Sequence, residues 1–108
     1  MISIDDFAKI EVKVGLVTNV ADQEGSEKLI KLKVDFGEDD KRTIFTAVRT
    51  LGYTPDYFLN KKWLFVTNLE PKKIMGEESQ GMILAVDGDD KPVFVAPVEE
   101  VAIGAKLR

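Results

Sequence analysis

The side chains that could carry chemistry in this chain are lysines, carboxylates and hydroxyls, because its 108 residues contain neither histidine nor cysteine. That absence removes disulfides, thiolate nucleophiles, imidazole bases and the usual zinc ligands. Carboxylates alone can bind a hard cation, but the acidic run Asp87-Gly88-Asp89-Asp90 lacks the ligand spacing and the final glutamate of a calcium loop. We interpret that run as a turn, and we expect no metal, no cofactor and no enzymatic activity.

Lysines and hydroxyls gather in three short blocks, which are better suited to binding than to catalysis. Lys31 and Lys33 alternate with apolar residues, Lys72 and Lys73 stand side by side, and residues 79–82 read Ser-Gln-Gly-Met. Each block also has a plainer interpretation. The lysines could be the solvated face of a strand and of a loop, and the Ser-Gln-Gly-Met block could be a bulged entry to a strand, with the methionine packed inside.

The net charge of −4 and a pI near 4.8 argue against a strong, sequence-independent grip on phosphate backbones. The acidic residues, however, bunch in turn-like runs such as Glu38-Asp39-Asp40 and Glu99-Glu100. A locally basic face can therefore coexist with an acidic whole.

Alternating apolar residues predict that short strands position these blocks. The cleanest case is residues 29–36, where Ile30, Leu32 and Val34 take one face and the lysines take the other. Gly15 suggests a bulge or a sharp coil in the first strand, and at least one of Trp63 and Phe65 is expected in the core rather than on a stacking surface. The predicted strands cover residues 10–16, 29–36, 43–48, 63–69, 82–86 and 93–95.

Short helices are predicted to begin at Ser3, where a hydroxyl can cap free N–H groups, and at Thr54, which precedes a proline. Strands outnumber helices, and the one helix after the third strand fits an all-β, five-stranded Greek-key OB-fold barrel with short helices and a C-terminal extension. We expect a single domain over residues 1–108. Its extension, residues 97–108, is too apolar for a free tail and is predicted to pack on the barrel or on a second copy of the chain.

No apolar run is long enough to cross a bilayer, and the N-terminus lacks the pattern of a secretory signal. These two features predict a cytoplasmic protein that does not bind membranes.

Several sequence blocks, in order, resemble the tRNA-binding domain family, and together they cover essentially the whole chain. The blocks are Ile4-Asp5-Asp6-Phe7-Ala8-Lys9-Ile10, Val12-Lys13-Val14-Gly15, Lys28-Leu29, Lys33-Val34-Asp35-Phe36-Gly37, Asn68-Leu69-Glu70-Pro71-Lys72-Lys73-Ile74-Met75-Gly76, Glu78-Ser79-Gln80-Gly81-Met82-Ile83-Leu84-Ala85, Glu99-Glu100-Val101 and Gly104-Ala105-Lys106-Leu107-Arg108. The Ser-Gln-Gly-Met block after Asn-Leu-x-Pro-Lys-Lys is far more specific than a lone glycine motif.

The resemblance implies a non-catalytic module that recognises tRNA by its shape, with or as a subunit of a methionyl-tRNA synthetase, and as a homodimer. The family pattern would assign the tRNA contacts to Lys28, Lys33, Arg42, Lys72, Lys73, Ser79 and Met82. A protein that recognises folded RNA by its shape needs point charges, small hydrogen-bonding groups and an apolar surface for unstacked bases. These residue types supply all three.

Two segments depart from the family pattern. Residues 23–29 read Gln-Glu-Gly-Ser-Glu-Lys-Leu where the family most often has His-Pro-Asn/Asp-Ala-Asp-Lys-Leu, and Thr46-Ala47 replaces a Ser-Gly pair. Affinity or the preferred RNA is therefore expected to differ. A related branch of the same fold binds polypeptide, so an export-type or general protein chaperone is the alternative function. That branch usually lacks the Ser-Gln-Gly-Met block.

Overall fold

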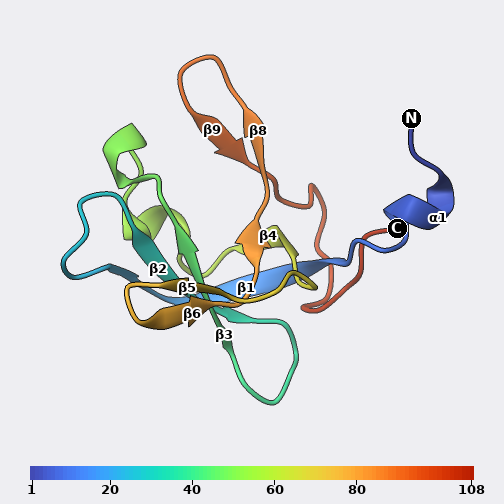
Figure 1. Ribbon diagram of the computed structural model, residues 1–108, viewed down its shortest axis with the longest axis horizontal. Coiled ribbons are helices and arrows are strands. Elements are labelled where there is room, and N and C mark those ends of the chain that lie inside the picture. Colours follow the sequence, from blue (N-terminus) through green and yellow to red (C-terminus); the bar gives the residue numbers. More distant parts are fainter.

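Five antiparallel strands form the main sheet of the computed structural model, which describes residues 1–108 (Figure 1). Their order is β3-β2-β1-β4-β7, and the two edge strands approach one another, so that the sheet is a nearly closed barrel. The barrel strands are β1 (Val12–Asp22), β2 (Ile30–Asp35), β3 (Arg42–Thr46), β4 (Lys62–Val66) and β7 (Met82–Ile83). This architecture is consistent with the predicted OB-like barrel.

The inner face of β2 is filled by the apolar residues that the alternation predicted, whereas Ile10, expected in the first strand, is exposed and precedes β1. On β2, Ile30, Leu32 and Val34 are fully buried, while the residues between them are half-buried. Trp63 and Phe65 of β4 also lie in this core, as expected. Burial of these side chains is the main driving force that closes the sheet.

The helices are single turns; those after Ser3 and Thr54 begin where the sequence predicted, and the turn at residues 49–51 was not predicted. Helix α1 (Ile4–Phe7) has a capping box, in which the Ser3 hydroxyl accepts from the Asp6 N–H and the Asp6 carboxylate accepts from the Ser3 N–H. Two 3₁₀ turns, η1 (Arg49–Leu51) and η2 (Pro55–Tyr57), join β3 to β4. The structure contains no helix with the length and apolar character that crossing a membrane requires.

Gly15 does not form the bulge expected of it. The irregularity in β1 falls between Val17 and Asn19 instead. A Cβ atom on Gly15 would lie 2.5 Å from Cγ1 of Val34 and 2.7 Å from Cε1 of Phe36. The glycine is therefore needed for close packing of β1 against the core, a requirement that a single sequence pattern does not reveal.

We expect Gly15→Ala to lower the free energy of unfolding by about 1 to 3 kcal/mol, because the added methyl group would force core side chains out of their rotamers. Chemical denaturation would measure the loss. Gly52→Ala is a useful contrast: its site is open, so any cost there comes from the positive φ of 93° alone. An unchanged midpoint for Gly15→Ala would contradict the close-packing explanation.

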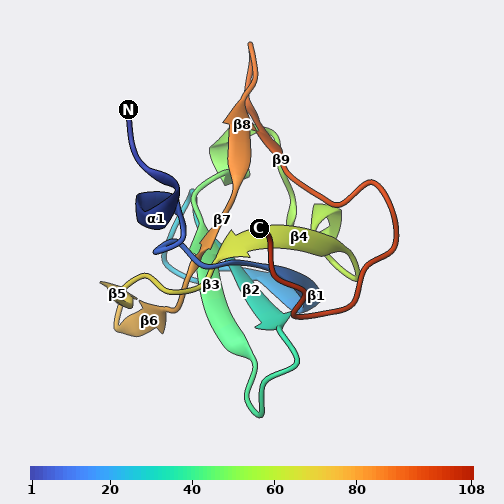
Figure 2. The ribbon, with the colours of Figure 1, turned by 90° about the vertical axis from the view of Figure 1, so that its right-hand side faces the viewer.

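Two small hairpins stand outside the barrel. The expected strand over residues 82–86 is in fact divided, because β7 is followed by β8 (Ala85–Asp87), which pairs with β9 (Pro92–Phe94). This hairpin projects away from the barrel in both ribbon views (Figures 1 and 2). The second hairpin, β5 (Lys72–Ile74) with β6 (Glu77–Ser79), was not predicted.

The C-terminal segment lies along β1. The N–H of Val14 donates to the carbonyl of Ala105 at 2.9 Å, and the N–H of Leu107 donates to the carbonyl of Val12 at 2.8 Å. Leu107 also lines an apolar groove of about 270 Å³ with Ile4 and Phe7 of α1. The two ends of the chain therefore lie side by side, and α1 itself buries none of its residues.

Candidate functional site

The candidate site is the outer face of β2 and β3. Lys31 and Lys33 point outward from β2, and in the antiparallel register they lie opposite Phe45 and Thr43 of β3. Residues directly opposite on neighbouring strands share a face, so the two lysines, the aromatic ring and the hydroxyl belong to one surface.

The β5–β6 hairpin folds over this face. The Lys31 ammonium pairs with the Glu77 carboxylate at 2.6 Å, and the Ser79 hydroxyl accepts from the Phe45 N–H at 3.1 Å. The turn of the hairpin has positive φ at both central residues, 50° at Met75 and 84° at Gly76. Such a type I′ turn is usually signalled by Asn-Gly or Asp-Gly, so the Met-Gly pair was the available signal and it was easily overlooked.

A hollow of about 430 Å³ opens between the hairpin and β3. Half of its lining is apolar, and a lysine stands at its wall. The lining residues are Phe45, Leu69, Glu70, Lys72, Ile74, Ser79, Gly81 and Met82. A flat apolar group would suit such a site, with any negative charge placed beside Lys72 and not beside Glu70.

The hollow brings together three of the residues assigned from the family pattern: Lys72, Ser79 and Met82. Lys72 lies directly opposite Ser79 in the hairpin, whereas Lys73 lies opposite Glu78 on the other side. The two neighbouring lysines therefore face in opposite directions, and only Lys72 lines the hollow.

Lys33 lies one step further along the same outer face. It is half-buried, and its ammonium donates to the Thr43 hydroxyl at 2.6 Å. Thr43 is in turn bound by Gln80, whose side-chain oxygen accepts from the Thr43 N–H at 2.9 Å and whose N–H donates to the Thr43 carbonyl at 2.8 Å. Thr43 and Gln80 thus connect Lys33 to the Ser79 segment, and neither was singled out from the sequence as a binding residue by itself.

Lys28 stands in the loop of residues 23–29, which borders the face on its other side. The tip of this loop reaches the hairpin, since a Cβ atom on Gly25 would lie 3.2 Å from Cε of Met75. Lys28, Lys72 and Lys73 are exposed and take part in none of the ion pairs of the chain. Their charges remain available to a ligand.

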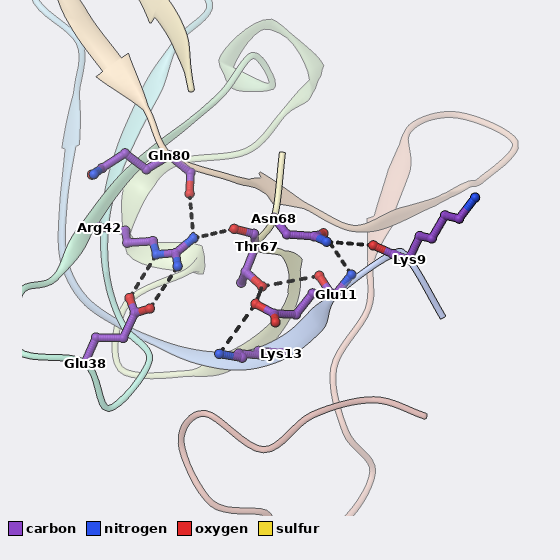
Figure 3. Close-up of polar contacts among 8 residues, drawn as sticks. All are labelled: Lys9, Glu11, Lys13, Glu38, Arg42, Thr67, Asn68 and Gln80. Carbon is purple, nitrogen blue, oxygen red and sulfur yellow. Dashed lines mark hydrogen bonds and ion pairs between the residues drawn. The ribbon is translucent and has the colours of Figure 1, made fainter. Parts of the chain in front are cut away.

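Arg42 does not join this surface. On β3 it alternates with Phe45 and Thr43, and its guanidinium lies 5.4 Å from the ring centre of Phe36, a core residue. It is bound by the Glu38 carboxylate and by backbone carbonyls (Figure 3). Of the residues assigned by resemblance, Arg42 is the one that the structure places on the inner side of its strand.

Three carboxylates around the hairpin have a pKa below the ordinary value of 4.5. The hydrogen bond from Arg42 lowers the pKa of Glu38, that from Thr67 lowers the pKa of Glu11, and that from Lys31 lowers the pKa of Glu77. In each case the charged form has a partner in the folded protein that the unfolded chain does not offer.

These shifts predict that acid weakens the fold. A carboxylate with a lowered folded pKa stabilises the protein above its unfolded pKa, and this contribution is lost as pH falls through the folded pKa. We expect the melting temperature to stay constant down to about pH 4.5 and to decrease below it. In Glu38→Gln this decrease should be smaller, because one of the titrating carboxylates is absent. Thermal denaturation at several pH values measures the effect. A melting temperature that rises on acidification would rule out a stabilising role of these carboxylates.

OB barrels use the face of strands 2 and 3, with the loops on either side of it, to bind oligonucleotides and oligosaccharides. Here that face carries a lysine and a hydroxyl beside an apolar hollow, between the loop of residues 23–29 and the β5–β6 hairpin. The arrangement can hold phosphate groups by charge and a base by apolar contact.

Comparison with known proteins gives consistent matches over nearly the full chain. Residues 12–106 match the model of the family described as "Putative tRNA binding domain". The chain is 43% identical over 106 residues to the methionine–tRNA ligase of Helicobacter pylori strain J99 and 41% identical over 107 residues to that of Pyrococcus horikoshii. These alignments cover 98% and 99% of this chain, but only 16% and 14% of the two ligases.

Solved structures show the same fold. The MetRS-related protein of Pyrococcus horikoshii superposes with a TM-score of 0.91 at 40% identity, with 100% of this chain and 98% of that chain covered. The CsaA chaperone protein of Picrophilus torridus superposes with a TM-score of 0.87 at 29% identity and full coverage of both chains.

Proposed function

From the premise that this chain belongs to the tRNA-binding domain family, we propose that it binds tRNA by its shape, without catalysing a reaction on it. The observation that carries the proposal is the hollow shared by Lys72, Ser79 and Met82, with Lys33 on the adjoining sheet face. Lysine ammonium groups would meet phosphates, and the hollow would receive an unstacked base from a loop of the tRNA.

Recognition by shape, rather than by base identity, follows from the way the hollow is lined. The Ser79 hydroxyl already accepts from the Phe45 N–H and lies 3.5 Å from the Gly81 carbonyl. It has little hydrogen-bonding capacity left to read the edge of a base. Apolar contact with Leu69 and Met82 would accept any base, because every base has a π face.

The charge balance supports docking of moderate strength. With a net charge of −4, the protein would neutralise few phosphates, and the affinity should fall by roughly 0.7 to 0.9 log units per neutralised phosphate for each tenfold rise in salt. We therefore expect a shallow salt dependence.

A methionyl-tRNA synthetase is the partner that we propose, because the matched ligases contain a region similar to this chain. The module would act with, or as a subunit of, that enzyme in the cytoplasm. It would raise the affinity of the enzyme for tRNA. Co-purification from native lysate, followed by identification of the bound protein and RNA, tests this partnership.

We also propose that the protein is a homodimer. Helix α1 exposes Ile4 and Phe7 beside Leu107 and the apolar groove at the chain ends, and contiguous apolar surface of this kind is typical of a protein interface. Light scattering should give twice the chain mass at micromolar concentration. A monomer would refute the dimer and leave the tRNA proposal standing.

Polypeptide binding is the second candidate function, because the CsaA chaperone proteins share the fold at TM-scores of 0.87 and 0.84. A filter-binding assay with folded tRNA and with a short unstructured peptide separates the two. Retention of tRNA, and not of the peptide, is the expected result. The opposite ranking would replace the tRNA proposal by the chaperone one.

A further inference from the structure

One guanidinium group fastens both ends of the segment that carries the β5–β6 hairpin. Nη1 of Arg42 donates to the carbonyl of Thr67 at 2.6 Å and to the carbonyl of Gln80 at 3.2 Å (Figure 3). Thr67 directly follows β4, and Gln80 directly follows β6. The residues between them, 68–79, therefore leave and rejoin the barrel at a single side chain.

Arg42 is itself held rigidly. Its Nε and Nη2 donate to the two carboxylate oxygens of Glu38 at 2.9 and 2.8 Å, and the group lies over the ring of Phe36. A two-pronged pair of this type fixes the plane of the guanidinium as well as its position. Four of the five N–H donors of the group are thus engaged within the chain, and the side chain is only 21% exposed.

The first end of the segment is also tied to the N-terminal part of the chain. The Thr67 hydroxyl donates to the Glu11 carboxylate at 2.6 Å. Asn68 accepts from the Glu11 N–H at 2.8 Å and donates to the Lys9 carbonyl at 2.7 Å. Figure 3 shows these contacts forming one continuous group, in which Thr67 and Glu11 connect Arg42 to Asn68 and Lys9.

The hairpin depends on these ends because it has little support of its own. Its two strands have three residues each, and an isolated two-stranded hairpin is marginal in water. Beyond its ends, hydrogen bonds tie it to the barrel at Glu77, through Lys31, and at Ser79, through Phe45. A change at the ends should therefore move Lys72, and with it the wall of the hollow.

We propose that Arg42 is a positioning residue, which holds the β5–β6 hairpin in its binding position instead of contacting tRNA. The proposal rests on the proposed function for its effect on tRNA, but its structural part can be tested in the free protein. It revises the role that the family pattern suggested for this residue, and it leaves the phosphate contacts to the lysines.

The test uses the full chain and two substitutions, Arg42→Lys and Arg42→Gln. A lysine keeps the charge but cannot bind a carboxylate in two places and two carbonyls at once. In hydrogen exchange of the free protein, both variants should lose about tenfold or more of the amide protection of residues 72–79. Amides of β1 and β2 should keep theirs, which separates local loosening from general destabilisation.

Binding to tRNA gives the second readout. We expect both variants to lose about tenfold in affinity, the effect of one charge-assisted contact, and to show equal salt slopes, because either substitution moves Lys72 away from its phosphate. If Arg42 met a phosphate, Arg42→Lys would bind nearly as the parent does, and Arg42→Gln would reduce the salt slope by about 0.7 to 0.9. That pair of results, or unaltered protection of residues 72–79, would overturn the proposal.

Two further variants sharpen the result. Glu38→Gln leaves Arg42 in place but weakens its anchor, so it should loosen the hairpin and weaken tRNA binding; a phosphate-contacting Arg42 would instead be freed and bind more tightly. Arg49→Lys is the matched control, because Arg49 pairs with Asp22 and binds the carbonyl of Ser26 in the other loop. It should leave residues 72–79 protected.

If the parent protein does not bind tRNA, the proposed function fails while hydrogen exchange still decides the role of Arg42.

Discussion

Replacing Phe58 by alanine is expected to lower the free energy of unfolding by about 3 to 5 kcal/mol, the range for removing a buried phenylalanine ring. Phe58 is fully buried, directly after the 3₁₀ turn that covers the barrel. Its ring centre lies 4.9 Å from that of Phe94 and 5.7 Å from that of Trp63, both at edge-on angles. The cavity would therefore open between the barrel and the β8–β9 hairpin.

Such a loss is a large share of the 5 to 15 kcal/mol typical of a whole domain, so the melting temperature should fall by at least about 12 °C. Calorimetry or denaturant titration would measure it. Val86→Ala is the control, because Val86 is exposed on the outlying hairpin and its truncation should change the stability by no more than about 0.5 kcal/mol. Equal effects of the two substitutions would show that burial of the Phe58 ring does not stabilise this aromatic cluster.

Removing Lys33 and Lys72 together is expected to reduce tRNA affinity on the order of 100-fold. Each would lose a charge-assisted contact to phosphate of about 1.5 kcal/mol or more, and the salt slope should fall by roughly 1.4 to 1.8. Lys33 lies on the sheet face and Lys72 at the wall of the hollow, so the pair samples both parts of the proposed docking surface.

The matched control is Lys61→Ala with Lys91→Ala, which changes the net charge by the same amount elsewhere on the molecule. These two lysines lie over the rings of Tyr57 and Tyr53, at 4.9 and 4.6 Å. Filter binding at several salt concentrations should show a small, uniform loss for the control pair. A similar loss for both pairs would mean that total charge, and not the β2–β3 face, governs binding.

Much of the fold could be predicted from short-range patterns. Alternation over residues 29–36 identified β2 and its buried side, because successive side chains of a strand point to opposite faces. Ser3 predicted the start of α1 for the same kind of reason, since a cap hydroxyl acts on the N–H groups of the next few residues. The β5–β6 hairpin was missed because its strands are short and its turn uses Met75 where asparagine or aspartate is usual.

The candidate site could be predicted only in part. Family resemblance drew attention to segments that border the hollow and the adjoining sheet face, but a pattern of residue types does not say which neighbour a side chain meets. Lys72 and Lys73 are adjacent in the sequence and face opposite sides of the hairpin. Arg42 is as basic as Lys33, yet its donors are engaged by Glu38 and by two backbone carbonyls of the same chain.

The sequence by itself determined which residues of β2 are buried, because alternation there depends only on the geometry of the local backbone, whereas β3 buries four consecutive residues. Only the tertiary structure decided that the side chains of Val34 and Phe36 pack directly against Gly15. It also decided that Arg42 joins the ends of the 68–79 segment, and that Lys72 and Met82 line the same hollow. Each of these depends on contacts between residues far apart in the chain. Such contacts exist only once strand pairing has fixed the register of the barrel.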